Sequence, residues 1–267
     1  MARTVSRLSV RKRPLKTLER VLSKAGLGSR REARSWIGAG RVRVNGRLIQ
    51  TPDLWVDLER DRVTLDDKPV RPETRLYLLL YKPTGYVTTY HDPEGRPTVY
   101  DLIRDMEAWV APVGRLDRDT SGLLILTNDT QLAERLTNPE HQVPKTYLVK
   151  CASLLTDEQI ERLRQGVELS DGMSRPAEVI RLRDSGKHTF LEMTIREGRN
   201  RQVRRMLEAV DSTVLKLVRT AIGPVRIGDL RMGTWRALTA AELIALKGGA
   251  TSRPATRSSP RTLRRRC

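Results

Sequence analysis

The spacing between apolar residues changes along the N-terminal part of the chain, and the first spacing is that of a helix. Residues 17–26 and 29–37 place apolar residues three or four positions apart, which is typical of helices with one buried face. Ser29 and Glu32 have the spacing of a capping box at the start of the second segment. The sequence therefore predicts two short helices, the first of which ends at Gly26.

The pattern then changes to alternation, which is typical of strands. Residues 41–49 alternate basic and apolar side chains on both sides of Asn45-Gly46, a strong signal for a tight β-hairpin. Residues 61–70 carry a more acidic pattern that predicts a second hairpin. Residues 15–72 are therefore predicted to form a small domain.

Residues 76–247 mix strand-like and helical segments without the regular alternation of a parallel sheet. Apolar or alternating runs predict strands at 76–81, 123–127, 145–151, 189–198 and 215–225. Amphipathic or capped runs predict helices at 130–138, 156–166, 200–210 and 239–246, with Asn128 and Gln131 as candidate caps of the first. We expect an α+β fold, in which the larger domain has a mixed, mostly antiparallel sheet flanked by helices.

The net charge of +18 is concentrated in three places. Residues 1–16 and 248–267 each carry six Lys or Arg and no acid, and their composition predicts disordered basic tails at 1–14 and 248–267. Residues 17–47 carry eight basic and two acidic residues, whereas the next 200 residues are balanced. Solubility would not require such clustering, so the charge favours a nucleic-acid-binding module attached to another domain.

Composition excludes several classes of protein. No apolar run approaches the length of about 18 residues that a transmembrane helix needs. The basic N-terminus lacks the apolar core of a signal peptide, although an organellar transit peptide stays open. Two cysteines, Cys151 and Cys267, provide no disulfide framework and suit a reducing cytoplasm. The three histidines are scattered, and no phosphate loop or serine-nucleophile elbow is present, so we expect a cytoplasmic protein without metal or membrane attachment.

Two neighbouring acids stand in the stretch 113–129, just before a buried strand. Asp117 and Asp119 lie among arginines, immediately before the aliphatic run 123–127. Charges at such a place are costly unless they are paired or take part in chemistry. A glycosidase-like carboxylate pair is an alternative, but acids two positions apart would have to reach opposite sides of a sugar. We therefore expect the two acids to have different roles.

The basic N-terminal module has two candidate nucleic-acid partners. Residues 17–40 fit a DNA-binding helix-turn-helix, but the basic hairpin that follows belongs to the same charged face and a larger domain comes next. The run GLGSRREARSWIGAGRVRVNGRL resembles the small RNA-binding domain first described in ribosomal protein S-four, over residues 15 to about 72. The resemblance implies contacts with phosphates of structured RNA from Arg30, Arg31, Arg34, Arg41 and Arg43.

Four motifs in the larger domain resemble one family of enzymes. GRLDRDTSGLLILTND, KTYLV, EGRNRQVRRM and LVRTAIGP are together similar to the bacterial ribosomal RNA pseudouridine synthases that modify a single uridine. HDPEGRPTVYDLI is most similar to the large-subunit type called synthase B. The resemblance implies an isomerase that breaks the bond between ribose and uracil N1, rotates the base and rejoins it through C5. No cofactor or metal is implied.

The same resemblance implies roles for individual residues. Asp117, in the GRLD element, is implied to act on the sugar as nucleophile or base, with Arg204 as the cation that would keep it ionised. Tyr147 is implied to stack on the uracil and to assist proton removal at C5. The rest of the implied pocket consists of Arg115, Leu116 and Leu217.

Several of these residues also have an ordinary structural interpretation. Arg204 could be a surface charge on its helix, and Tyr147 and Leu217 could be core residues. Asp119 is expected to fix its loop or to pair with Arg118.

The expected partner is ribosomal RNA, free or within a precursor ribosomal particle, and we expect a monomer. The target uridine must leave its stack, while the basic module supplies shape recognition and salt-sensitive affinity. Further RNA-backbone contacts are expected from Lys82, Lys145, Arg199 and Arg201. The competing hypothesis is a noncatalytic RNA-binding or ribosome-assembly protein, and a DNA-binding regulator is a third.

Overall fold

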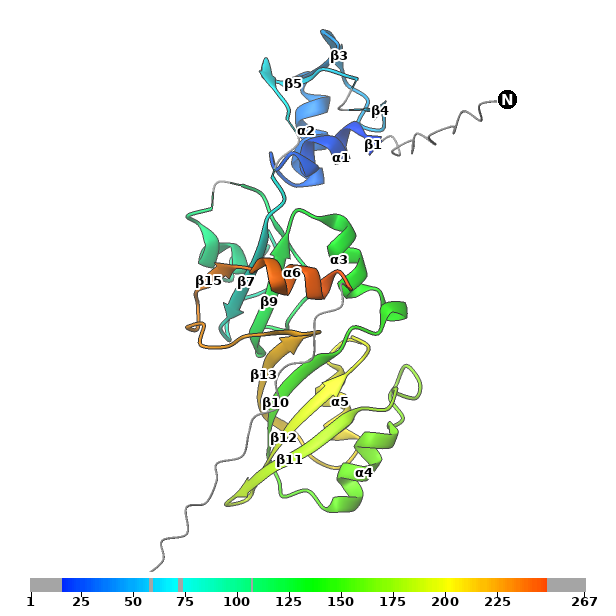
Figure 1. Ribbon diagram of the computed structural model, residues 1–267, viewed down its shortest axis with the longest axis vertical. Helices are drawn as coiled ribbons and strands as arrows, with labels where there is room; N and C mark the ends of the chain where they lie inside the picture. Colours follow the sequence, from blue (N-terminus) through cyan, green and yellow to red (C-terminus); the bar gives the residue numbers. More distant parts are fainter. Residues whose placement is uncertain (1–15, 58–59, 72–73, 107, 249–267) are drawn as a thin grey trace, which may run out of the picture. The chain divides into compact units, whose positions relative to one another are not determined.

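The computed structural model describes residues 16–57, 60–71, 74–106 and 108–248 (Figure 1). The basic tails that the sequence predicts to be disordered lie outside these residues, apart from their innermost edge at Gly248. Contacts divide the chain into two compact units. The first runs to Glu134 and takes in Arg231–Arg236, and the second comprises Arg135–Leu230 together with the chain from Ala237.

The first unit begins with the two helices and the hairpins that the sequence predicts. Its elements are β1 (Lys16–Thr17), α1 (Leu18–Lys24), α2 (Arg30–Gly38), β2 (Val42–Val44), β3 (Arg47–Ile49), β4 (Trp55–Val56), β5 (Val63–Leu65) and β6 (Lys68–Pro69). Strand β1 pairs with β4, and a four-stranded sheet has the order β3-β2-β5-β6. The capping box of Ser29 and Glu32 is present, and Asn45 and Gly46 have φ of 53° and 81°, as a tight hairpin turn requires.

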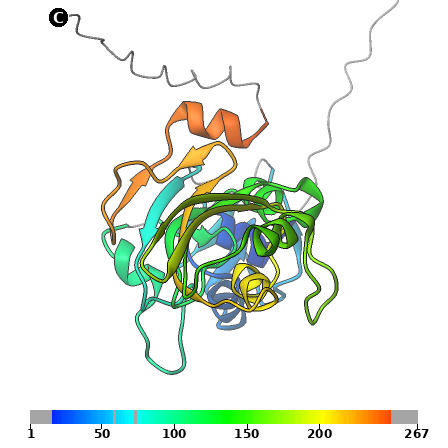
Figure 2. The same ribbon diagram turned by 90° about the horizontal axis from the view of Figure 1, so that it is seen from below.

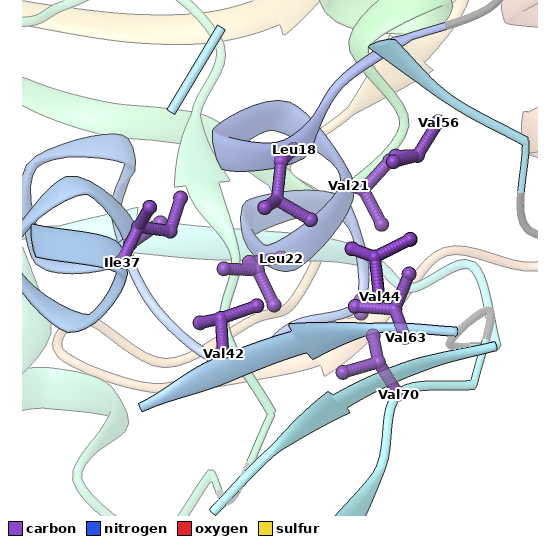
Figure 3. Close-up of a cluster of buried hydrophobic side chains, with 11 residues drawn as sticks. Leu18, Val21, Leu22, Ile37, Val42, Val44, Val56, Val63 and Val70 are labelled. Carbon is purple, nitrogen blue, oxygen red and sulfur yellow. The ribbon is translucent and has the colours of Figure 1, made fainter. Parts of the chain in front are cut away.

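Aliphatic side chains from both helices and from three strands form the core of this N-terminal module (Figure 3). Leu22, Ile37 and Val42 are completely buried, and Val21 and Val63 are 2% exposed. Burying one such side chain contributes about 1.5–3 kcal/mol. The apolar residues of the helical segments and those of the alternating segments therefore pack together in a single hydrophobic cluster.

The rest of the first unit is built around one fully buried strand. Its elements are β7 (Tyr77–Lys82), the 3₁₀ helix η1 (Val99–Ile103), β8 (Ala111–Pro112), β9 (Ser121–Thr127), the start of α3 (Thr130–Thr137) and the start of β15 (Trp235–Ala237). Every residue of β9 is buried, and β7 and β8 pair with it antiparallel. The returning segment closes the other edge of β7, because Gly233 N donates to Tyr81 O (2.8 Å) and Tyr81 N donates to Thr234 O (3.0 Å).

Asp129, not Asn128 or Gln131, caps the helix after β9, so the expected cap is wrong by one residue. Asp129 Oδ1 accepts hydrogen bonds from Gln131 N (3.1 Å) and Leu132 N (3.4 Å). The Asn128 side chain instead accepts from Leu76 N (2.9 Å). Asn128 thus ties the start of the domain to β9, which sequence spacing alone does not reveal.

The second unit is an antiparallel sheet with helices packed against it. Its elements are η2 (Pro139–His141), β10 (Lys145–Cys151), α4 (Asp157–Gln165), β11 (Glu178–Ser185), β12 (His188–Ile195), α5 (Gln202–Glu208), β13 (Val214–Ile222), β14 (Val225–Arg226) and α6 (Ala240–Leu246). The strand order is β11-β12-β10-β13, and β14 pairs with β13. Each of these neighbouring pairs is antiparallel, so the expected α+β fold is confirmed.

The two faces of this sheet differ in environment. Along β10, Tyr147, Val149 and Cys151 are buried, whereas Leu148 is 38% exposed. Figure 2 shows α5, in yellow, on one side of the strands. Helix α4 is held to the sheet and to the end of α5, because the Arg164 guanidinium donates to Val179 O and the Gln159 amide donates to Val210 O. Helices α4 and α5 thus cover one face of the sheet, and the part of the other face around Leu148 is open.

Candidate active site

The loop between β8 and β9 presents Asp117. Val113 N donates to Ile125 O (2.8 Å), and Thr120 N donates to Asp117 O (3.1 Å). Gly114 has a φ of 71°, a left-handed conformation that favours glycine. The Asp117 side chain is half-buried, whereas Asp119 is exposed. The two acids therefore differ in burial, and the expected difference in their roles stays a prediction.

Lys82 holds the main chain of this loop. It is completely buried, and its Nζ donates hydrogen bonds to Pro83 O (3.0 Å), Asp117 O (3.0 Å) and Thr120 O (2.8 Å). The expectation that Lys82 contacts the RNA backbone is therefore wrong, because all three protons of the ammonium point to carbonyl oxygens inside the protein. A lysine at a strand end beside a Pro-Gly loop resembles an exposed residue in sequence, and only the tertiary structure reveals the buried acceptors.

Two further contacts fix the same loop from the segment after β7. Thr88 Oγ1 donates to Leu116 O (2.8 Å) and accepts from Leu116 N (3.3 Å). Gly85 N donates to Arg118 O (2.8 Å). The backbone that carries Asp117 is thus held at successive residues, because hydrogen bonds reach the carbonyl oxygens of Leu116, Asp117, Arg118 and Thr120. Arg115 is exposed on this loop, and Leu116 is buried.

Tyr147 and Leu217 lie in the second unit, on the buried face of its sheet. In the strand register, Tyr147 is opposite Met193 on one side and Arg219 on the other. Leu217 is opposite Val149 in the same ladder, and its side chain is 5% exposed. The structure therefore brings Tyr147, Leu217 and Arg219 to one face.

Arg204 lies on α5 with its side chain buried. It is 8% exposed, and its Nη1 donates to Val214 O (3.3 Å). The alternative in which Arg204 is a surface charge is therefore wrong. Asp117 belongs to the first unit and Arg204 to the second, so their pairing stays a prediction.

Arg219 is a buried cation that was not predicted from the sequence. It is 4% exposed on β13, between the buried residues Leu217 and Ala221. The alternation of LKLVRTAI carries the signal, because it places Arg219 among the positions that are otherwise apolar.

Lys145 is influenced by this buried cation. Burial, and then the charge of Arg219, lower the pKa of Lys145. Its Nζ donates to Val143 O (3.0 Å). This half-buried position makes Lys145 a poor candidate for a phosphate contact at the surface.

Arg199 is half-buried and connects two parts of the second unit. Its guanidinium donates to Gly172 O (2.8 Å) and Met173 O (2.8 Å), and its Nε lies 3.3 Å from Glu197. These donors are used inside the unit, and the expected RNA contact of Arg199 stays a prediction. Arg201 is exposed at the start of α5 with a φ of 46°, and its expected RNA contact stays a prediction.

The five arginines of the N-terminal module that were expected to contact RNA fall into two groups. Arg34 pairs with Glu19, Arg41 with Asp66 (2.5 Å) and Arg43 with Asp67 (3.7 Å). The hydrogen bond from Arg34 is the main cause that lowers the pKa of Glu19. Arg30 and Arg31 are exposed on α2, and within the described ranges neither has an ion pair. Of the five arginines expected to contact RNA, these two are the ones not already matched by a carboxylate.

Neither a metal cluster nor a membrane-spanning helix occurs among the described residues. In that part of the chain, no group of three or more His, Cys, Asp or Glu residues could hold a metal ion. No helix among the same residues is long and apolar enough to cross a membrane.

Comparison with known proteins finds one family match for the N-terminal module and one for the larger domain that follows it. The sequence model of the RNA pseudouridylate synthase family matches residues 76–209, and that of the S4 domain matches residues 17–63. A protein of Aquifex aeolicus named as an uncharacterized RNA pseudouridine synthase is 43% identical over 230 residues, which cover 86% of this chain and 92% of that protein. The chain belongs to the RNA pseudouridylate synthase family. It is therefore an enzyme, an isomerase that acts on RNA.

Two further relatives support the assignment of this pseudouridylate synthase. Ribosomal large subunit pseudouridine synthase B of Bacillus subtilis is 38% identical, over 87% of this chain and 96% of its own. A solved structure described as a pseudouridylate synthase aligns with a TM-score of 0.62 at 30% identity, over 86% of this chain and 99% of that one. The sequence predictions of the family and of an N-terminal RNA-binding domain are therefore confirmed.

Proposed function

We propose that this pseudouridylate synthase converts one specific uridine of large-subunit ribosomal RNA to pseudouridine. The name of the Bacillus subtilis relative supports the large-subunit target, since the likeness extends over nearly the full length of both chains. A Vibrio cholerae relative of the same name is 42% identical over 83% of this chain. A ribosomal RNA substrate would place the enzyme in the cytoplasm. We propose a monomer that acts on free RNA or on a precursor ribosomal particle.

The catalyst in this proposal is Asp117. Its carboxylate acts on the ribose side, as nucleophile or base, while the bond between C1′ and uracil N1 breaks. The base then rotates, C5 bonds to C1′, the proton leaves C5, and N1 ends protonated, so that no atom is gained or lost. Fixed geometry around the reacting carboxylate favours this role. The observation that carries the assignment is the hydrogen bonding of the loop backbone at Leu116, Asp117, Arg118 and Thr120.

The other proposed site residues assist this reaction in different ways. Arg204 would supply the cation that pairs with the Asp117 carboxylate during the reaction. Tyr147 would stack on the uracil and assist proton removal at C5, and Leu217 would form an apolar wall. Arg115 and Leu116 would border the flipped nucleotide from the Asp117 loop. The burial of Tyr147, Arg204 and Leu217 supports a site that excludes water.

We propose a division of the chain in which residues 15–72 bind RNA and residues 76–247 carry out the reaction. Flipping a uridine out of its stack costs a few kcal/mol, which contacts in the pocket offset. The N-terminal module would recognise RNA shape and contribute affinity through phosphate contacts. The basic tails would add nonspecific attraction only.

A pseudouridine map of ribosomal RNA tests the proposed target. Cells without the gene should lack one pseudouridine of the large-subunit RNA, and the purified enzyme should restore that residue on unmodified RNA. Parallel reactions with small-subunit RNA should yield none. A missing pseudouridine in small-subunit RNA, or in no ribosomal RNA, would show that the proposed target is wrong.

Arg30 and Arg31 should account for part of the salt dependence of RNA binding. In a double variant, Arg30→Gln with Arg31→Gln, the slope of log affinity against log salt should become shallower by about 0.7–0.9 for each phosphate that is no longer neutralised. The measurement is a filter-binding titration at several salt concentrations. The control is Arg104→Gln with Arg162→Gln, which removes the same charge from exposed positions outside the N-terminal module. Equal slopes for the two double variants would contradict this role.

A further inference from the structure

The uncovered face of the second unit carries a row of positive charges centred on an aromatic ring. Arg183 of β11 is opposite Phe190 of β12, Phe190 is opposite Lys150 of β10, and Lys150 is opposite Lys216 of β13. Neighbouring strands lie about 4.8 Å apart, so the row extends over roughly 14 Å. We call these four residues the cationic row. It crosses the sheet at right angles to the strands.

The ring of Phe190 lies between two of the cations. The guanidinium carbon of Arg183 lies 4.4 Å from the ring centroid, and Lys150 Nζ lies 5.8 Å from it. Both distances are within the range of a cation–π interaction. Phe190 is the single phenylalanine of the chain, and it is half-buried on an open sheet face. These contacts orient the cations around a flat surface that stays accessible.

A groove borders the cationic row. It has a volume of about 330 Å³, and its apolar walls include Leu148, Leu182 and Val218. Leu148 and Leu182 are 38% and 50% exposed. Apolar side chains are thus presented to solvent beside the charges, which is the combination that an amphipathic ligand requires.

Among the residues that the structure describes, none of the three cations of the row, Lys150, Arg183 and Lys216, is in an ion pair, although Glu192 lies opposite Leu148 on the same face. By contrast, Arg181 on the same strand β11 pairs with Asp157 and Asp184, each at 2.9 Å. The register also places Lys150 directly opposite Lys216, and like charges at opposite positions destabilise a sheet. An anionic ligand would relieve this repulsion.

We propose that this face is a second RNA-binding surface, which binds a single-stranded segment of the substrate RNA. Phosphates would contact Lys150, Arg183 and Lys216, and a base would stack on Phe190. An open four-stranded antiparallel sheet that presents an aromatic ring suits exposed bases, because every base has a flat face. The inference rests on RNA being the substrate and not on which uridine is modified.

The proposed surface is separate from the residues assigned to the reaction. Along β10, Leu148 and Lys150 alternate with Tyr147 and Val149, and successive side chains of a strand point to opposite faces. Helix α5, which carries Arg204, is linked to the opposite, helix-covered face. A strand bound here would therefore add affinity without occupying the reaction pocket.

Binding measurements on inactive protein test the surface. In an Asp117→Asn background, Lys150→Gln with Lys216→Gln should weaken binding of a large-subunit RNA fragment with single-stranded flanks by about five- to thirtyfold. The salt slope should become shallower by about 0.7 for each phosphate that is no longer neutralised. Phe190→Leu should weaken binding by about fivefold or more, because leucine cannot stack on a base. The matched control is Lys187→Gln with Arg162→Gln, which removes equal charge elsewhere in the unit and should change affinity less than twofold.

Three further readouts make the result decisive. Melting curves should show that each variant stays folded, and RNA carrying a photoreactive uridine should cross-link to the peptide that contains Phe190. Unchanged affinity and slope in all variants, or cross-links only to other peptides, would overturn the proposal. Unchanged RNA affinity together with capture of an acidic protein by wild-type enzyme alone would assign the face to a protein partner and would also overturn it. Because turnover is absent from these assays, failure here is distinguishable from failure of the proposed ribosomal target.

Discussion

Replacing Asp117 with asparagine should abolish pseudouridine formation while RNA binding stays within a few fold of wild type. Asparagine keeps the size of the side chain but supplies no anionic oxygen to act on the ribose. The loop backbone should stay in place, because its bonds to Lys82 and Thr88 involve main-chain atoms. We expect turnover to fall by about 10³-fold or more. The measurement is tritium release from ribosomal RNA labelled at uracil C5.

Asp119→Asn is the matched control for this experiment. It makes the same chemical change two residues away on the same loop, at an exposed position. We expect this variant to keep measurable turnover. A comparable loss of activity in both variants would mean that the loop geometry, and not the Asp117 carboxylate, accounts for the effect. Normal turnover by Asp117→Asn would remove Asp117 from the mechanism.

Lys82→Met should destabilise the protein and lower turnover together. Methionine is of similar length and apolar, but the carbonyls of Pro83, Asp117 and Thr120 would each lose a charged donor. Thr120 N still donates to Asp117 O, so two carbonyls are left without a partner. An unsatisfied buried acceptor costs about 1–3 kcal/mol, so we expect the free energy of unfolding to fall by about 2 kcal/mol or more. Urea unfolding measures this loss. Turnover measured well below the unfolding transition should also be reduced, because the Asp117 backbone is then less constrained.

Thr88→Val is the comparison for Lys82→Met. It removes the hydroxyl that bonds to both polar groups of the Leu116 backbone, with little change in volume. Neutral hydrogen bonds contribute about 0.5–1.5 kcal/mol each, so its effect should be the smaller one. A Lys82→Met protein with wild-type unfolding midpoint and turnover would show that these three bonds neither stabilise the loop nor position Asp117.

The sequence predicted elements well where short-range signals agree. The capping box of Ser29 and Glu32, together with Asn45-Gly46, defines the helices and the hairpin of the N-terminal module without reference to tertiary contacts.

Strand β11 was not predicted from the sequence, because its apolar residues do not alternate cleanly with polar ones. A register shift between Arg181 and Arg183 lets the consecutive residues Leu182 and Arg183 both be exposed. A strand with one open face and a bulge loses the period-two signal.

Buried charges account for the main errors at the candidate site. Lys82 was expected to contact RNA, yet its ammonium bonds to carbonyl groups that are distant in sequence. Arg219 was overlooked because a charged residue in an apolar run is ordinarily assigned to the surface. The positions of such partners depend on how strands and loops pack, so they become visible only in the folded structure. Asp117, Tyr147 and Arg204 came from motif resemblance, and their roles stay predictions.

The return of residues 231–236 to the first unit has a consequence for synthesis on the ribosome. Strand β7 is made early, but Gly233 and Thr234, which bond to Tyr81 on its outer edge, are made after the whole stretch Arg135–Leu230 of the second unit. At about 5–20 residues per second, this delay is on the order of ten seconds or more. During that interval the nascent chain exposes an unpaired strand edge, a known starting point for wrong association. A chain that stops before Arg231 would keep that edge open permanently, so truncated products should depend on chaperones more than the complete enzyme does.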